Sequence, residues 1–315
     1  MDDIIIIGSS LAAIKQLIST LSTCFALKDL SPLQFFLGVQ VTHTGDLHLS
    51  QQQYITDLLR RTNMNATKPL PTPMQTNLRL QKDASSAMHD PSMFRSVVSA
   101  LQYVIFTRLK LSYVVNKVCQ FMHSPQDHHW KAIKRILRYL GGTRTHGLIL
   151  QPKPSPTIRA FSDADWGSDV DHCKSTTGYC VYYGRNLIAW SSHKQRVVSC
   201  SNIEAKYRSI AAVLTEVLRL QSLLHELHLP TSQPQLFSDN LGVVLLSANP
   251  IMHSRTKHFE LDLHFVKDYV QQHKISLVHL PARFQIADIL TKSISGPAFL
   301  DFRCKLMVGV PPTSV

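Results

Sequence analysis

The sequence predicts an α/β protein whose C-terminal half forms a mixed sheet flanked by helices. Beyond residue 156, strand-like and helix-like patterns follow in the order strand, strand, strand, helix, strand, helix, helix, strand, helix. That order is typical of a sheet with helices on its faces. Two proline-rich segments, 68–74 and 151–156, exclude helix and central strand and are therefore interpreted as linkers.

The part before the second linker is predicted to be mainly helical, with one hairpin that turns at Gly45. Strands are expected at 4–7, 33–42 and 46–50, and helices at 10–23, 50–62, 93–106, 112–123 and 124–142. The last of these helices starts at Ser124-Pro125 and ends at Gly141-Gly142.

The part after the second linker is expected to supply all strands of the mixed sheet. Strands are predicted at 157–163, 177–183, 187–192, 235–239 and 275–280, and helices at 202–228, 241–248, 257–272 and from Gln285. On the helix at 202–228, the apolar stripe predicted to face the core is Ile203, Tyr207, Ile210, Leu214 and Val217.

Charge and cysteine content narrow the class of protein. The 315 residues carry 33 Lys and Arg against 21 Asp and Glu, a net charge of +12 that favours a polyanionic partner. The six cysteines show no paired spacing, which indicates an intracellular protein of the cytoplasm or nucleus that is not secreted, without a disulfide framework or zinc site. The apolar run 4–7 is too short to span a bilayer, so no membrane partner is expected. The oligomeric state is left open.

The helix predicted at 124–142 carries a basic face opposite its apolar stripe. The face consists of Lys131, Lys134, Arg135 and Arg138. It is interpreted either as an ordinary solvated face or as a stripe that contacts phosphates.

Three aspartates stand at points where a sheet could bring them together. Asp163 and Asp239 end predicted strands, and Asp288 follows the last predicted strand. Converging carboxylates repel one another and need cations, and two Mg²⁺ or Mn²⁺ ions between them would form a phosphodiester-cleaving site. The alternative for each aspartate is a helix cap or turn, which is most tempting for Asp239 before Asn240.

Sequence motifs before and after the second linker resemble the C-terminal part of copia-type LTR retrotransposon Pol polyproteins. Motifs from residue 161 onward resemble the RNase H region, and those before residue 141 resemble the back part of the reverse transcriptase. They are FSDADW (161–166), KSTTGY (174–179), AWSS (189–192), RTKH (255–258), ADILTK (287–292), FLGV (36–39) and KRILRYL (134–140).

The resemblance implies an RNase H-like mixed five-stranded sheet preceded by an α+β remnant of reverse transcriptase. The implied parts are a truncated palm and thumb remnant (1–73), a helical thumb and connection region (74–153), the RNase H-like domain (154–298) and a C-terminal tail (299–315). The first part is expected to be poorly anchored. Met1-Asp2-Asp3 is similar to the end of the polymerase motif Tyr-x-Asp-Asp, so Asp2 and Asp3 would be relics of a catalytic site. Because the first metal-binding aspartate would lie upstream, reverse transcriptase activity is expected to be absent.

For the RNase H region, the resemblance assigns Asp163, Asp239 and Asp288 as three of four acidic metal ligands. The implied activity is hydrolysis, dependent on Mg²⁺ or Mn²⁺, of RNA in an RNA–DNA hybrid. Asp165, two residues after Asp163, is interpreted as a supporting or surface residue.

The fourth acid is where the sequence departs from the family. Lys206 stands at the position where the family has a catalytic glutamate, in the motif SNIEAKY (201–207). Glu204 remains a doubtful catalytic candidate, because Ser201 and Glu204 also form a capping box. At about 100° per residue, Glu204 and Lys206 point about 200° apart, so only one can face the aspartates. The chain is therefore either a ribonuclease H or a catalytically inactive nucleic-acid-binding remnant; another metal-nuclease family is a weaker alternative.

A turn at 107–110 and a pair of residues at 258 and 262 are two further points of interest in the sequence. The family's Thr-Arg-Pro-Asp is Thr107-Arg-Leu-Lys110 here, which reverses a charge and should alter the turn. His258 and Asp262 lie one helical turn apart, and they are interpreted either as a helix-surface pair or as contacts to the substrate strand.

Overall fold

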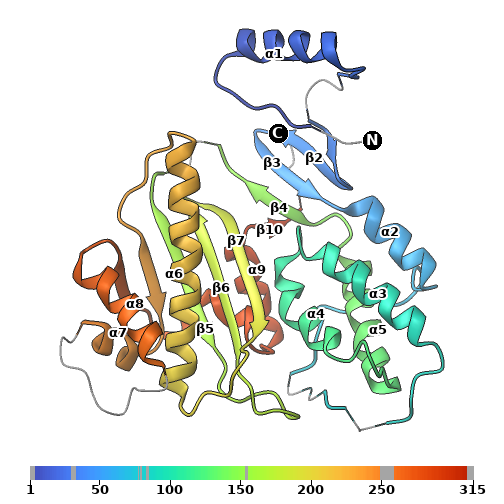
Figure 1. The fold of residues 1–315 in the computed structure, drawn as a ribbon. Helices are drawn as coiled ribbons and strands as arrows, with labels where there is room; N and C mark the ends of the chain where they lie inside the picture. The colour runs from blue at the N-terminus through green and yellow to red at the C-terminus, as the bar shows by residue number, and fades with distance from the viewer. Residues whose placement is uncertain are drawn as a thin grey trace.

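Two five-stranded sheets and the helices around them make up the computed structural model (Figure 1). The structure describes residues 4–29, 33–76, 78, 80–82, 85–152, 155–248 and 259–310. Within these ranges, no helix is both long and apolar enough to cross a membrane.

The C-terminal sheet has the strand order β7-β6-β5-β8-β9. Its strands are β5 (Ile158–Ala164), β6 (Thr176–Tyr183), β7 (Asn186–Lys194), β8 (Gln235–Ser238) and β9 (Ser276–His279). β6 pairs antiparallel with both β5 and β7, whereas β8 pairs parallel with β5 and β9 parallel with β8. The predicted mixed five-stranded sheet is confirmed, and parallel β5 and β8 end at the same edge.

The long helix α6 (Asn202–Glu226) lies across one face of this sheet (Figure 1). The Ser201 hydroxyl begins it by accepting a hydrogen bond from the Glu204 backbone N–H. α7 (Leu241–Ala248) and α8 (Glu260–Gln271) complete this layer. The core between helices and sheet contains Ile158, Ala160, Val181, Tyr207, Ile210, Leu214, Val217, Leu236, Leu263 and Val266.

One member of the predicted α6 stripe does not reach this core. Ile203 lies in the first turn of α6 and is 40% exposed, whereas Tyr207, Ile210 and Val217 are buried. Its neighbours Glu204 and Ala205 in the same turn are buried, so the exposure is confined to the side of the turn that carries Ile203.

The N-terminal sheet joins segments from both ends of the chain in the order β1-β2-β3-β4-β10. Its strands are β1 (Phe35–Phe36), β2 (Val39–Thr44), β3 (Asp46–Ser50), β4 (Gly147–Leu150) and β10 (Val308–Gly309), all antiparallel. The predicted hairpin at Gly45 is confirmed, and this glycine has the positive φ of 88° that a tight turn favours. β4 and β10 were not predicted.

Helices α2 (Gln52–Arg61), α3 (Pro91–Val104), α4 (Ser112–Cys119), α5 (Asp127–Gly142) and α9 (Gly296–Lys305) surround a second core. Its buried members include Ile55, Leu59, Phe94, Leu101, Ile136, Leu140, Leu148, Phe299, Phe302 and Val308. Two expectations are corrected by this core. The segment 35–61 is anchored, because α2 buries its apolar side chains there, and 299–310 is a packed helix and strand rather than a tail.

Residues 4–24, unlike the hairpin that follows them, do not pack into either core. Residues 4–7 form no strand, because no described segment pairs with them, so that prediction is wrong. The helix predicted at 10–23 is confirmed as α1 (Leu11–Cys24), which has no buried residue. In Figure 1, α1 lies at the top, apart from the rest of the chain.

The basic face of α5 is partly occupied by the chain itself. Arg135 donates a hydrogen bond to the Thr72 hydroxyl at 2.8 Å, and Arg138 donates to the Lys68 carbonyl at 2.8 Å. These bonds fasten the first proline-rich linker to α5. Lys131 and Lys134 remain exposed on this face.

Candidate functional site

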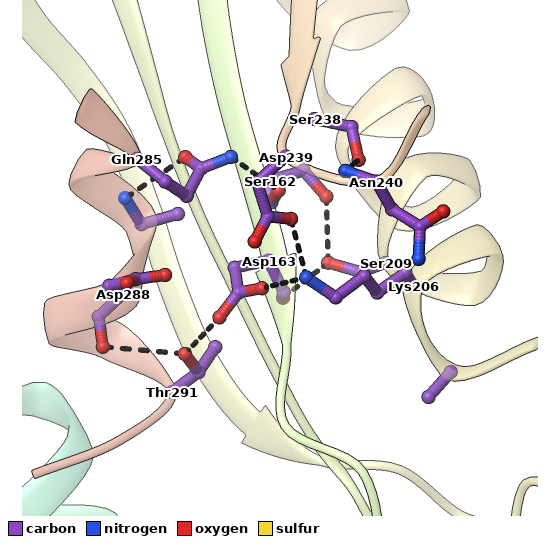
Figure 2. Close-up of polar contacts among 12 residues, drawn as sticks. Ser162, Asp163, Lys206, Ser209, Ser238, Asp239, Asn240, Gln285, Asp288 and Thr291 are labelled. Carbon is purple, nitrogen blue, oxygen red and sulfur yellow. Dashed lines mark hydrogen bonds and ion pairs between the residues drawn. The ribbon is translucent and has the colours of Figure 1, made fainter. Parts of the chain in front are cut away.

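The three aspartates singled out from the sequence lie together at one edge of the C-terminal sheet (Figure 2). Asp163 belongs to β5, Asp239 directly follows β8, and Asp288 belongs to the short 3₁₀ helix η4 (Ile286–Leu290). One carboxylate oxygen from each lies within 4.8 Å of the others. The predicted convergence is therefore confirmed.

Lys206 of α6 enters this cluster from the helix layer. Its ammonium donates a hydrogen bond to Asp163 Oδ1 at 3.0 Å and another to Asp239 Oδ1 (Figure 2). Burial alone would lower the pKa of Lys206, but the two carboxylates outweigh burial and raise this pKa above its usual value. Likewise, burial would raise the pKa of Asp163, yet Lys206 and other neighbours lower it. Asp163 is thus ionised and paired with a protonated lysine.

Hydroxyl and amide groups fix the backbone and carboxylate of Asp163. The Thr291 hydroxyl donates to Asp163 Oδ2, and the Ser209 hydroxyl donates to the Asp163 carbonyl at 2.7 Å. The Gln285 side chain donates to the Ser162 carbonyl at 3.1 Å. A Cβ on Gly178 would lie 2.6 Å from the Thr291 side chain, so only glycine allows η4 to approach β6 this closely. Sequence reasoning missed Thr291 and Ser209, because hydroxyl residues carry no distinctive spacing.

Asp288 pairs with a second lysine that the sequence analysis did not single out. Lys292 Nζ lies 2.9 Å from Asp288 Oδ2 and 3.9 Å from Asp163 Oδ2. Burial, followed by the neighbouring Asp163 charge, raises the pKa of Asp288 to about 7 despite Lys292. Among the described residues, the other oxygen of Asp288 has no hydrogen-bond partner. The i, i+4 spacing of Asp288 and Lys292 was the signal that could have identified the pair.

Glu204 is not brought into the cluster. Its carboxylate accepts a hydrogen bond from the Cys200 backbone N–H at 2.8 Å and pairs with Arg208 at 2.7 Å. Of the capping box predicted for Ser201 and Glu204, the Ser201 half is present, whereas the Glu204 carboxylate bonds the Cys200 N–H in place of the Ser201 N–H. Lys206, and not Glu204, therefore faces the aspartates, whereas the helical geometry predicted only that one of the two would do so.

The remaining candidates lie outside the cluster. Asn240, rather than Asp239, caps α7, because its side-chain oxygen accepts from the Val243 N–H at 3.1 Å. The Asp165 carboxylate accepts from the Thr176 N–H and the Ser168 hydroxyl, so it shapes the loop after β5. Asp262 lies in the first turn of α8. Asp2, Asp3 and His258 lie outside the described residues.

The carboxylate oxygens of the cluster suit a hard divalent ion, but the Lys206 ammonium already lies between two of them. Carboxylate oxygens are the ligands that Mg²⁺ and Mn²⁺ prefer. The Lys206 ammonium is hydrogen-bonded to two of the three carboxylates, and Lys292 pairs with the third. The arrangement therefore fits an internal ammonium in place of a bound metal ion.

We expect Asp288→Asn to stabilise the protein at pH 8 but not at pH 4. The raised pKa means that folding favours the protonated carboxyl, so stability is lost as pH rises from 3.8 to about 7. Asparagine keeps the neutral form at every pH. Thermal melts of both proteins across this range measure the difference. Asp301→Asn is the matched control, because Asp301 is exposed and pairs with Lys305 at the same spacing. An equal gain at pH 4 would contradict the prediction.

Comparisons with known proteins find one family model and several related proteins. The family model for reverse transcriptase (RNA-dependent DNA polymerase) matches residues 1–76. The Retrovirus-related Pol polyprotein from transposon RE2 of Arabidopsis thaliana is 44% identical over 99% of this chain, which spans 22% of that polyprotein. An uncharacterized mitochondrial protein of Arabidopsis thaliana is 42% identical over 69% of this chain and 90% of its own length. Among solved structures, LC11-RNase H1 in complex with an RNA/DNA hybrid is 14% identical with a TM-score of 0.33, covering 42% of this chain and 93% of that chain.

Proposed function

Because the chain belongs to the family of copia-type retrotransposon Pol polyproteins, we propose that its RNase H-like domain binds RNA–DNA hybrids without cutting them. The observation that carries the proposal is the Lys206 ammonium, which is hydrogen-bonded to Asp163 and Asp239. The ancestral hydrolysis of the RNA strand would need divalent ions at these carboxylates.

Electrostatics explains why the ammonium and the ions exclude each other. A divalent ion placed about 4 Å from an ammonium is opposed by about 8 kcal/mol at an effective dielectric constant of 20. Lys206 is also part of a folded helix and is only 8% exposed, so it cannot diffuse away as a free cation would. The Lys206 ammonium should therefore occupy the aspartate cluster in preference to Mg²⁺ or Mn²⁺.

Binding without catalysis is supported by charge. The chain carries a net charge of +12. Two lysines pair with the three aspartates of the cluster, and the pKa of Asp288, raised to about 7 by burial and the Asp163 charge, leaves its carboxyl partly protonated near neutral pH. A phosphate backbone can therefore approach this edge of the sheet without meeting an uncompensated acidic patch. Recognition of a hybrid through its shape and backbone needs no base-specific contact.

A second candidate function is metal-dependent hydrolysis of RNA in RNA–DNA hybrids. It is favoured by one observation, namely that three carboxylate oxygens lie within 4.8 Å of one another. In this case Lys206 would have to leave Asp163 and Asp239 when ions and substrate arrive.

Incubation with a labelled RNA–DNA hybrid decides between the two candidates. We expect fluorescence anisotropy to show binding that weakens with salt, and gels to show no RNA fragments with Mg²⁺ or Mn²⁺. Chelation with EDTA should leave binding unchanged, because no ion takes part. Cleavage by the unmodified chain that EDTA abolishes would establish the second function instead.

A further inference from the structure

Trp166 lies on the loop that follows β5 and is 57% exposed. It comes three residues after Asp163, at the end of the sheet where the aspartates converge. Burial of a tryptophan side chain would be favourable, so an exposed one near a candidate site needs an explanation.

The exposed ring is held in a fixed orientation. The indole N–H donates a hydrogen bond to the Ser199 carbonyl at 3.0 Å. On either side of Trp166, the Asp165 carboxylate accepts from the Thr176 N–H, and the Gly167 N–H donates to the Ser175 hydroxyl at 3.1 Å. A ring fixed in this way loses little conformational entropy when a planar ligand stacks on it.

The hydrogen bond to Ser199 joins Trp166 to the loop that precedes α6. In that loop Val197 and Val198 are 53% and 50% exposed, and Arg196 is exposed beside them. We call Trp166, Val197 and Val198 the Trp166 platform. The loop leads into the helix that carries Lys206, so the platform connects the two elements that supply Asp163 and its ammonium partner.

The chemistry of the platform limits what it can bind. An exposed aromatic ring, bonded to a loop that also carries exposed aliphatic side chains and Arg196, suits a nucleotide, since every base offers a π face and its phosphate carries a negative charge. The platform is too small for a stable protein interface, which buries about 800 Å² on each partner. The +12 net charge of the chain favours a nucleic acid over other ligands.

We propose that the Trp166 platform stacks an unpaired base of a nucleic-acid strand that adjoins the hybrid at the aspartate–lysine site. The inference rests on the proposed function, because the strand is placed by the hybrid. The duplex part of a hybrid keeps its bases paired, so the platform contacts only a single-stranded extension.

The test compares a blunt RNA–DNA hybrid with the same hybrid carrying a single-stranded DNA overhang. We expect Trp166→Ala to weaken binding of the overhang substrate about 10- to 100-fold, the range for loss of one base–aromatic stack. Binding of the blunt hybrid should stay unchanged, and Trp166→Phe should retain most of the affinity for the overhang. Phe106→Ala is the matched control, because Phe106 is a 61% exposed aromatic side chain on another part of the chain.

Fluorescence gives a second readout at the ring itself. In the Trp130→Phe, Trp190→Phe double variant, Trp166 is the remaining tryptophan. The overhang substrate should quench its fluorescence, while the blunt hybrid should not. The inference alone would be overturned if Trp166→Ala and the unmodified chain bound the overhang substrate equally well. It would also be overturned if Trp166→Ala lost equal affinity for both substrates and had a lower melting temperature. Failure of the chain to bind any hybrid would overturn the proposed function as well.

Discussion

Lys206→Glu is expected to convert the aspartate–lysine site into one that binds Mg²⁺ or Mn²⁺. The substitution removes the ammonium that is hydrogen-bonded to Asp163 and Asp239 and places a fourth carboxylate at the same helical position. Without ions, four neighbouring carboxylates should repel and lower the melting temperature. Saturating ions should reverse the loss, since a ligand at 100 times its dissociation constant stabilises by about 2.7 kcal/mol.

The measurement is the melting temperature of both proteins with and without each ion, followed by isothermal titration calorimetry. We expect ion-dependent stabilisation of Lys206→Glu and little for the unmodified chain. Cleavage of the hybrid should appear only in the variant. Lys206→Gln separates loss of the ammonium from gain of the carboxylate, and Lys134→Glu repeats the charge change at an exposed position on α5. If neither ion changed the melting temperature of Lys206→Glu, the interpretation that Lys206 takes the place of a metal ion would be refuted.

Lys110→Met is expected to stabilise the protein. Lys110 is 2% exposed, and among the described residues its ammonium has no hydrogen-bond partner. The ring of Tyr139, 5.4 Å from the ammonium, is its favourable neighbour. Burial, followed by the charges of Arg108 and Arg303, lowers the pKa of Lys110 well below 10.5. Methionine keeps most of the volume and removes the uncompensated charge, for a gain of about 1–4 kcal/mol.

The gain should depend on pH in a defined direction. Because the pKa is lower in the folded state, the unfolded chain binds more protons between that value and 10.5, so stability of the unmodified protein rises with pH there. The advantage of Lys110→Met is therefore largest at and below the folded-state pKa and shrinks as pH rises from that value toward 10.5. Thermal melts at several pH values test this, and each kcal/mol corresponds to about 2–4 °C for a domain of 150–250 residues.

Lys134→Met provides the control for this substitution. Lys134 is exposed on α5, so the same change there should alter stability by less than about 0.5 kcal/mol. A lower melting temperature for Lys110→Met than for the unmodified chain would show that the buried ammonium has a stabilising role.

The part of the candidate site that lies at the ends of strands was predictable from the sequence. Asp163 and Asp239 stand at the ends of parallel neighbours, so topology alone brings them to one edge. The periodicity of α6 also indicated that either Glu204 or Lys206 would face them. The sequence could not show that Lys206 reaches two carboxylates at once, because that depends on the distance between helix and sheet.

The N-terminal sheet shows why other parts of the fold were missed. β10 has two residues, and β4 has four, so neither offers enough alternation to be recognised as a strand. Their pairing, Val308 with Leu148, links positions 160 residues apart, and local patterns carry no information about such partners. In contrast, α7 was predicted with its observed bounds, because it is a continuous apolar helix that begins at an Asn cap.

The pairing of β4 with β10 has a consequence for the order in which the chain folds during synthesis. The ribosome releases β1 to β4 before the aspartate-bearing sheet. The strand that completes their sheet, and the aromatic side chains of α9 that contribute to the core beneath it, emerge only after that second sheet. The N-terminal sheet and its core therefore keep apolar surface uncovered until the whole segment between β4 and β10 has been synthesised. Loss of only the final dozen ordered residues would leave that sheet and its core incomplete, however well the aspartate-bearing sheet had formed.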